Sequence, residues 1–203
     1  MIDLPLKEQQ LRLREEVILQ AVNQLLAQKG YDAMTVDEVA AKVGLTKPSL
    51  YKYFESKEAL AAAALIRLLD QTLAAVRAQP TQQPAVQRLR GVLRWALEQH
   101  LRGAMPLLPS TRSSLRESLL GDSRYVERLQ ALSTTLLAWI EEAQREGALN
   151  PALPAEVVLY TLYARSCDPV LEFLRAGGQY ADDEIVDLVL ATCLDGLRLR
   201  AGG

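Results

Sequence analysis

Residues 35–57, TVDEVAAKVGLTKPSLYKYFESK, decide the fold of this chain because they contain two helix starts separated by one tight turn. Thr35 is a residue type that caps helix N-termini, and Glu38, three residues later, completes a capping box. The apolar residues that follow recur with the spacing of a single helix face. They are Val36, Val39, Ala40 and Val43. The pattern predicts a short helix that begins directly after Thr35.

A second short helix is predicted beyond Gly44. Glycine adopts a positive φ at no steric cost, so Gly44 suits the position that follows a helix end. Thr46 can cap the next helix, and Pro48 lies in its first turn, where a missing N–H is tolerated. Leu50 and Phe54, four residues apart, are expected to anchor this helix in the core. The side chains left for other faces are Lys47, Ser49, Tyr51, Lys52 and Tyr53.

Two helices around a glycine turn, the second with a basic and hydroxyl-rich face, form the pattern of a helix-turn-helix, whose second helix enters the DNA major groove. The net charge of −2 and the pI near 5.6 contrast with this interpretation. Locally, however, residues 45–57 hold three lysines against Glu55 alone. Since salt screens charges beyond about 10 Å, the nearby charge decides phosphate attraction. We therefore expect DNA binding with modest non-specific affinity, although three lysines without the motif would indicate only a solvated face.

The length and composition are those of a globular protein. A chain of 203 residues, 49% apolar and 24% charged, can form one or two domains with a sizeable core. The first ten residues mix Asp3, Lys7 and Glu8, so we expect no signal peptide. No charge-free run approaches the roughly 20 apolar residues that a membrane-spanning helix needs. The expected location is the cytoplasm.

The cysteines and the histidine give little support to catalysis or metal binding. Cys167 and Cys193 lie in helical patterns without CxxC spacing, which predicts buried thiols, with redox sensing as the alternative. His100 is the only histidine, so no metal site and no cofactor are expected. A nucleophile–base pair would have to combine Cys167 and Asp168 with His100, and the chain contains no phosphate-binding glycine motif. The sequence favours a protein that is not an enzyme.

The rest of the chain has helical periodicity interrupted by proline and glycine, which predicts an all-α fold. Residues 11–29 are expected to complete a three-helix head with the two short helices. Ser56 can cap a fourth helix that runs to about residue 78, and Lys57 beside its N-terminus is a candidate phosphate clamp. Further helices are expected at residues 85–102, 110–120, 121–146 and 183–199. The expected domains are residues 1–55 for DNA binding and residues 56–203 for effector binding and dimerisation.

Two late segments are apolar on nearly every side: VVLYTLYA at residues 157–164 and LVLATCL at residues 188–194. A helix of this kind must be covered all round. Cover by a second chain predicts a homodimer, and a central helix buried within its own subunit is the alternative. A dimer also suits a helix-turn-helix, since two heads about 34 Å apart read a palindromic site.

The run from Val17 to Leu60 closely resembles the TetR family of bacterial transcriptional regulators. The resemblance implies a homodimer that binds operator DNA as a repressor. It also implies that a small molecule bound in the C-terminal domain releases the protein from the DNA. A ligand-independent regulator and an activator are the alternatives. The matching features are Gly30-Tyr31, Thr35, Val39-Ala40, Gly44-Leu45, Leu50-Tyr51, Phe54 and Ser56-Lys57-Glu58.

The resemblance also implies which residues contact DNA. Position by position, it assigns base-edge contacts to Lys47, Pro48, Ser49 and Lys52, whose side chains can reach guanine acceptors or thymine methyl groups. It assigns phosphate contacts to a second set, in which Tyr51 has packing within the head as its alternative role. That set consists of Thr35, Thr46, Tyr51, Tyr53 and Lys57.

For the ligand site the resemblance implies only the helices that would form it. A pocket should be mostly apolar with a few orienting polar groups. Seven of the eleven aromatic residues lie beyond residue 90, which is compatible with an apolar or aromatic effector. Each candidate residue has a role in the core or on the surface as its alternative. The candidates are Trp95, His100, Met105, Tyr125, Trp139, Tyr160, Tyr163 and Arg165.

Overall fold

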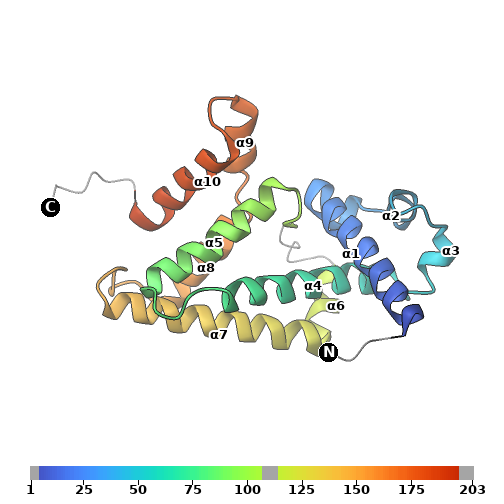
Figure 1. Ribbon diagram of the computed structural model, residues 1–203, viewed down its shortest axis with the longest axis horizontal. Coiled ribbons are helices and arrows are strands. Elements are labelled where there is room, and N and C mark those ends of the chain that lie inside the picture. Colours follow the sequence, from blue (N-terminus) through green and yellow to red (C-terminus); the bar gives the residue numbers. More distant parts are fainter. Residues whose placement is uncertain (1–4, 107–113, 197–203) are drawn as a thin grey trace. The chain divides into compact units, whose positions relative to one another are not determined.

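The computed structural model of the chain describes residues 5–106 and 114–196. Of Lys7, within the first range, it describes the backbone but not the side chain. All regular structure in this part of the chain is helical, which confirms the predicted fold class (Figure 1). The helices are α1 (Leu6–Ala33), α2 (Val36–Lys42), α3 (Lys47–Leu50), α4 (Lys57–Arg77), α5 (Ala85–Leu101), α6 (Ser114–Gly121), α7 (Ser123–Arg145), α8 (Ala155–Ser166), α9 (Val170–Gly177) and α10 (Asp182–Leu190), and a π-helical turn (Ala191–Asp195) continues α10.

Most helix boundaries lie within a few residues of the predicted ones, with two differences. Helix α1 begins at Leu6 rather than at residue 11, and Gly30, with φ of 74°, breaks its regular backbone before Ala33. The short helix α9 was not predicted as a separate element. The expected segments 110–113 and 197–199 lie outside the described residues.

The chain divides into two compact units. The head unit comprises Met1–Asp70 and Gly103–Arg128, and the body unit comprises Gln71–Arg102 and Leu129–Gly203. The long helices α4 and α7 each contribute residues to both units.

The core of the head unit includes a helix from much later in the chain. Leu50 of α3 is 1% exposed and packs in one cluster with apolar residues of α1, α2 and α4. Leu115 and Leu119 of α6 belong to the same cluster, and Tyr125 packs against it. The head is therefore built from more than the three helices that the sequence indicated.

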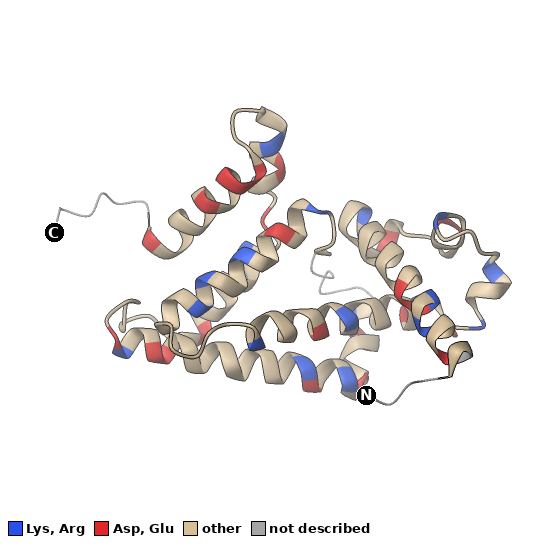
Figure 2. Cartoon of the chain, in the orientation of Figure 1, with Lys and Arg blue, Asp and Glu red and all other residues tan. Residues whose placement is uncertain are grey.

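Helix α5 lies at the centre of the body unit. Its buried face, which includes Leu89 and Leu97, lies against α8, α9 and α10. Two arginines on its outer side pair with acids of the last helical segment: Arg90 with Asp195, at 2.9 Å, and Arg94 with Asp187. Figure 2 shows basic positions along α5 and acidic positions along α10. The C-terminal helix is thus held to α5 by apolar burial and by ion pairs.

The sequence predicted no segment long and apolar enough to span a membrane, but α4 meets both criteria. Its length and its mean hydropathy of 1.6 are sufficient for a spanning helix by composition, since Arg67 and Asp70 are the only charges in its apolar stretch. In the structure 44% of that stretch is buried, and Leu60, Ala61 and Ala64 pack in the head core. The apolar character of α4 is that of a core helix.

We expect replacement of Leu50 by Ala to destabilise the head by about 2–5 kcal/mol, because it removes a fully buried side chain and leaves a cavity. Thermal unfolding followed by circular dichroism measures this. Leu120→Ala is the matched control, since Leu120 is 55% exposed in the same unit and its truncation should change stability by about 0.5 kcal/mol or less. Equal melting temperatures for both variants would contradict the assignment of Leu50 to the core.

Candidate nucleic-acid interface

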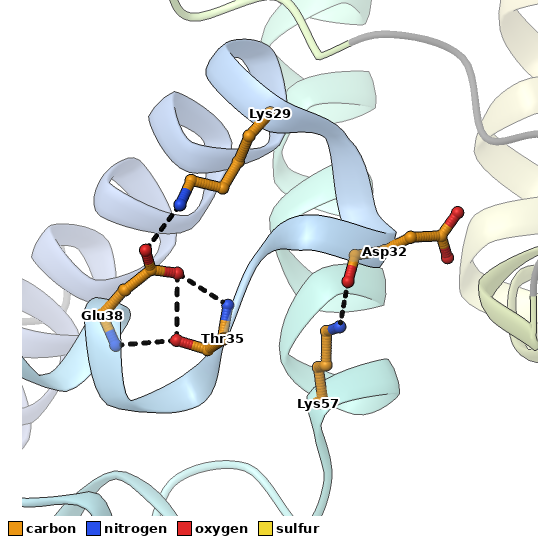
Figure 3. A network of polar contacts seen from close by, with 5 residues as sticks. All are labelled: Lys29, Asp32, Thr35, Glu38 and Lys57. Carbon is orange, nitrogen blue, oxygen red and sulfur yellow. Dashed lines mark hydrogen bonds and ion pairs between the residues drawn. The ribbon is translucent and has the colours of Figure 1, made fainter.

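A reciprocal cap fixes the start of α2. The backbone N–H of Glu38 donates to Thr35 Oγ1 at 3.3 Å, and the backbone N–H of Thr35 donates to Glu38 Oε2 at 3.0 Å. Lys29 of α1 pairs with the other oxygen of the same carboxylate (Figure 3). The hydrogen bond from Lys29, followed by those from Thr35, lowers the pKa of Glu38 to about 2. One carboxylate therefore links α1 to the helix-turn-helix.

The turn between α2 and α3 depends on Gly44, whose φ of 66° a side chain would strain. The chain then folds back, and the N–H of Leu45 donates to the carbonyl of Ala40 at 2.9 Å. Leu45 packs against the head core. The predicted turn chemistry is thus present at each of these positions.

Helix α3 has only four residues and depends on its cap and its buried leucine. The N–H of Ser49 donates to Thr46 Oγ1 at 3.3 Å, and the two hydroxyl oxygens lie 2.9 Å apart. Pro48 lies in the first turn, as the sequence indicated. Past Leu50, the N–H of Phe54 still donates to the carbonyl of Leu50 at 3.2 Å, so the helical path continues beyond the formal end of α3.

The predicted base-contacting residues lie together on α3 and its continuation. Lys47, Pro48 and Lys52 are exposed, and Ser49 is half-buried. Lys47 Nζ lies 2.8 Å from Asp37 Oδ2 on α2. The backbone N–H of Lys52 donates to the carbonyl of Ser49 at 3.4 Å, but among the described residues no hydrogen bond or ion pair is found for its ammonium group.

The predicted phosphate-contacting residues surround this face but differ in exposure. Thr35 and Thr46 are exposed at the two helix caps, and Tyr51 is 42% exposed. Tyr53, in contrast, is half-buried and packs against the head core, so only part of its side chain is available to a phosphate.

Lys57 lies at the start of α4, where Ser56 caps the helix by accepting a hydrogen bond from the N–H of Ala59 at 3.0 Å. The ammonium group of Lys57 lies 4.3 Å from the centre of the Tyr31 ring. It also donates to the carbonyl of Asp32 at 3.5 Å (Figure 3). These contacts place the end of α1 beside the start of α4.

A polar cluster lies behind Lys57 and joins three helices. Tyr31 donates its phenolic hydrogen to Glu58 Oε1 at 2.6 Å, and Ser114 at the start of α6 donates to the same oxygen at 3.4 Å. Burial, followed by the hydrogen bond to Glu58, raises the pKa of Tyr31 to about 12. The hydrogen bond from Tyr31 lowers the pKa of Glu58. Nothing in the sequence pattern indicated this cluster, because its members are distant in the chain.

The predicted ligand-binding residues belong to both units. Met105 and Tyr125 belong to the head unit, where Met105 is buried and Tyr125 packs against the core. The other six lie in the body unit, and most of them have intramolecular partners. These six are Trp95, His100, Trp139, Tyr160, Tyr163 and Arg165.

Within the body unit the partners of these residues are specific. His100 is buried, with Nδ1 3.3 Å from the carbonyl oxygen of Ser166 and Nε2 3.7 Å from Glu172. Trp139 stacks under the guanidinium of Arg88 at 4.8 Å.

The polar residues of α8 differ in their contacts. The hydroxyl of Tyr163 lies 3.0 Å from that of Ser133, and Arg165 pairs with Asp168. Tyr160 is 68% exposed and meets Tyr163 only edge-on. The sequence could supply these residue types but not the helix faces on which they lie.

A pocket of about 330 Å³ lies elsewhere in the body unit, between the α7–α8 connection, α8 and the π-helical turn. Its lining is largely apolar and includes Leu149, Val158, Leu162 and Leu194, with Cys193 beside them. None of the eight predicted ligand-binding residues lines it. Both cysteines are partly buried, and burial raises the pKa of each thiol, which agrees with the predicted role as buried thiols. No group of three or more metal-binding side chains occurs among the described residues.

Comparison with known proteins agrees with the architecture of the head. The family described as "Bacterial regulatory proteins, tetR family" matches residues 18–64, which contain α2, α3 and the start of α4. Residues 18–64 therefore belong to the TetR family. This family consists of transcriptional regulators that bind DNA through a helix-turn-helix and are not enzymes.

Among curated relatives, the transcriptional activator FasR of Mycolicibacterium smegmatis is 37% identical over 81 residues, which cover 39% of this chain and 37% of FasR. The regulator YuxN of Bacillus subtilis is 39% identical over 59 residues, or 29% of this chain and 20% of YuxN. The chain thus spans about a third or less of these TetR-type relatives. YdeS of Bacillus subtilis matches over more of its length, with 23% identity over 185 residues, 86% of this chain and 85% of YdeS.

Solved structures show the same fold over most of the chain. The ketosteroid transcriptional regulator KstR2 of Mycobacterium tuberculosis has a TM-score of 0.67 at 23% identity and covers 90% of this chain and 94% of its own. FadR of Bacillus subtilis in complex with stearoyl-CoA has a TM-score of 0.61 at 18% identity, with 90% and 99% covered. AibR in complex with isovaleryl coenzyme A and operator DNA has a TM-score of 0.60 at 20% identity, with 89% and 98% covered.

We expect the elevated pKa of Tyr31 to make the stability of the head depend on pH in the alkaline range. The folded protein binds the phenolic proton more tightly than an unfolded chain, whose tyrosine pKa is near 10. The stabilisation is therefore present below pH 10 and is lost as the pH rises through about 12. Tyrosinate absorbance during an alkaline titration measures this.

Tyr31→Phe should remove a late step of that titration, and Glu58→Gln should shift the step to lower pH by weakening the hydrogen-bond acceptor. Loss of a step near pH 10 in Tyr31→Phe, with the late step retained, would contradict the assignment.

Proposed function

We propose that the protein is a cytoplasmic transcriptional repressor that binds a palindromic operator as a homodimer and is released by a small-molecule ligand. The observation that carries the DNA-binding part is the capped helix α3 and its continuation, whose exposed face presents Lys47, Pro48 and Lys52 beside the half-buried Ser49. In this proposal residues 1–55 read the DNA, and residues 56–203 bind the effector and form the dimer.

In this proposal each DNA-contacting residue is assigned to a base or to a phosphate from the exposure of its side chain and the groups that it presents. Lys47, Ser49 and Lys52 present donors that reach base edges, and Pro48 presents an apolar surface to a thymine methyl. The caps Thr35 and Thr46, with Tyr51 and Lys57, hold phosphates and set the register. Tyr53 makes the smallest contribution because it is partly occupied by core packing.

A homodimer is supported by an apolar stripe on the surface of α8. Val157 and Tyr160 are 52% and 68% exposed, and Thr161 and Ala164 continue the same helix face. Leu188 on α10 is a further exposed apolar side chain, at 43%. Contiguous apolar surface of this kind marks an interaction site, and a second copy of the chain would cover it. Light scattering tests this, since a mass of 22.5 kDa at micromolar concentration would exclude the dimer.

For the effector we propose an acyl-CoA thioester. FadR and AibR, which share the fold, are described in complex with stearoyl-CoA and isovaleryl coenzyme A. An acyl chain is an apolar ligand, in agreement with the chemistry expected for the body. Of the candidate ligand residues, the six in the body unit remain in this proposal, whereas the packing of Met105 and Tyr125 in the head makes them weaker candidates.

An activator is the second candidate function, because FasR, which is 37% identical over 81 residues, is named an activator. The regulator IcaR of Staphylococcus aureus, 38% identical over 48 residues, is named a negative regulator, so relatives of both signs exist. Transcription from the protein's own upstream DNA, measured with and without the protein, distinguishes the two.

We expect Lys57→Ala and Lys47→Ala to affect DNA binding in different ways. Loss of a phosphate contact weakens binding to all sequences about equally and lowers the salt slope by roughly one unit, which is the result expected for Lys57. Loss of a base contact instead relaxes the preference at one position of the site, the result expected for Lys47.

Gel-shift titrations on the upstream DNA and selection from a randomised duplex pool measure both effects. Unchanged binding in both variants would refute this interface. The control is Arg77→Ala, an exposed residue at the far end of α4.

We expect stearoyl-CoA or isovaleryl-CoA to weaken operator binding by about 5–150-fold, the usual range of coupling between two sites. Coupling is reciprocal, so operator DNA should weaken the binding of the same thioester by an equal factor. Isothermal titration with and without the duplex measures it, and free coenzyme A is the control. Identical operator affinity with a bound and an absent thioester would exclude this effector class.

A further inference from the structure

The ion pair between Lys47 and Asp37 joins the first turns of α2 and α3. Lys47 Nζ lies 2.8 Å from Asp37 Oδ2, and both side chains are accessible to solvent, at 45% and 68%. The hydrogen bond to Asp37, and then its charge, raise the pKa of Lys47. The carboxylate therefore holds the ammonium group on the surface that the proposed function assigns to DNA.

Lys52, the second lysine of the same face, differs from Lys47 because its ammonium group is not paired with an acid in the described part of the chain. Lys52 is exposed, and no acid or carbonyl in the described ranges pairs with its ammonium group. A duplex that approaches this surface meets one lysine that is already available and one that must first leave a carboxylate.

We propose that Asp37 is a specificity-determining residue, which withholds Lys47 from phosphates and releases it only to a base edge with two acceptors. This inference rests on the proposed DNA-binding function. Asp37 lies two residues after Thr35, a proposed phosphate contact, so an unpaired Asp37 carboxylate would repel the neighbouring phosphates.

The energetics favour discrimination over affinity. An exposed ion pair is weak, so Lys47 can be released at little cost when a guanine offers O6 and N7 together. A single phosphate oxygen offers less and leaves Asp37 unpaired beside the DNA backbone. On random DNA Lys47 therefore remains on Asp37 and releases no counterion, whereas Lys52 contributes to the salt dependence.

The test measures binding of the full chain to a random-sequence duplex and to duplexes selected from a randomised pool, over a range of salt concentrations. Asp37→Asn should bind random DNA about threefold to tenfold more tightly at low salt, with a salt slope steeper by about one unit. Its affinity for selected duplexes should change less, so the ratio between the two falls. Asp37→Glu should retain the wild-type ratio, because it keeps the charge within reach of Lys47.

Two further variants show whether Asp37 acts through Lys47. In a Lys47→Ala background the steepening caused by Asp37→Asn should disappear. Asp32→Asn removes the same charge from an exposed head residue whose carboxylate pairs with no lysine in the described part of the chain, and its slope should equal that of the wild type. Asp37→Ser, which also suits a first helical turn, replaces Asp37→Asn if the melting temperature of that variant falls.

An unchanged slope in Asp37→Asn, or a steeper slope that persists without Lys47, would overturn the role of Asp37. A wild-type chain that binds no duplex at low salt would instead overturn the proposed function. The two failures are therefore distinguishable.

Discussion

The burial of Leu50 is the constraint on which the exposed face of α3 depends. A helix of four residues, such as α3, does not form in isolation. Ordering the backbone of the first turn costs more free energy than the hydrogen bonds of that turn provide. Here α3 exists because Leu50 is inserted in the head core, Thr46 satisfies the free N–H of Ser49, and Gly44 turns the chain toward that position. The outward direction of Lys47 and Lys52 is a consequence of where Leu50 points inward.

Electrostatics in this protein act over short distances. The net charge of −2 gives no long-range attraction to nucleic acid, and in the body unit the arginines of α5 are paired with acids. Any preference for DNA must therefore come from individual groups within a few ångströms of the duplex. The same short range explains why one carboxylate, that of Glu38, can link α1 to α2, and why we assign a role in recognition to the single acid that pairs with Lys47.

The sequence was sufficient where structure depends on neighbours in the chain. The capping box of Thr35 and Glu38, the turn at Gly44 and the inward Leu50 each follow from residues within four positions of one another, and all are present. Contacts between distant residues were not predictable in this way. Asp37 meets Lys47 across ten positions, and Tyr31 meets Glu58 across 27.

The candidate ligand residues show a second reason why the sequence could not predict every site. They were chosen by residue type, and type does not say which face of a helix becomes buried. The structure consequently divides them between the two units and gives Trp139 and His100 partners within the protein. The pocket in the body unit is lined mainly by aliphatic residues near chain connections, which carry no distinctive sequence pattern.

The packing of α6 into the head core has a consequence for modular evolution and for protein engineering. Leu115 and Leu119 are 1% and 3% exposed there, so an excised N-terminal segment would present to water the surface that they cover. A fusion of this helix-turn-helix to another ligand-binding domain would have to include α6. Otherwise the apolar surface that α6 covers would have to be redesigned. Recombination directly after the helix-turn-helix would give chimaeric proteins whose head core lacks Leu115 and Leu119. The helix-turn-helix and α6 are therefore expected to be inherited together.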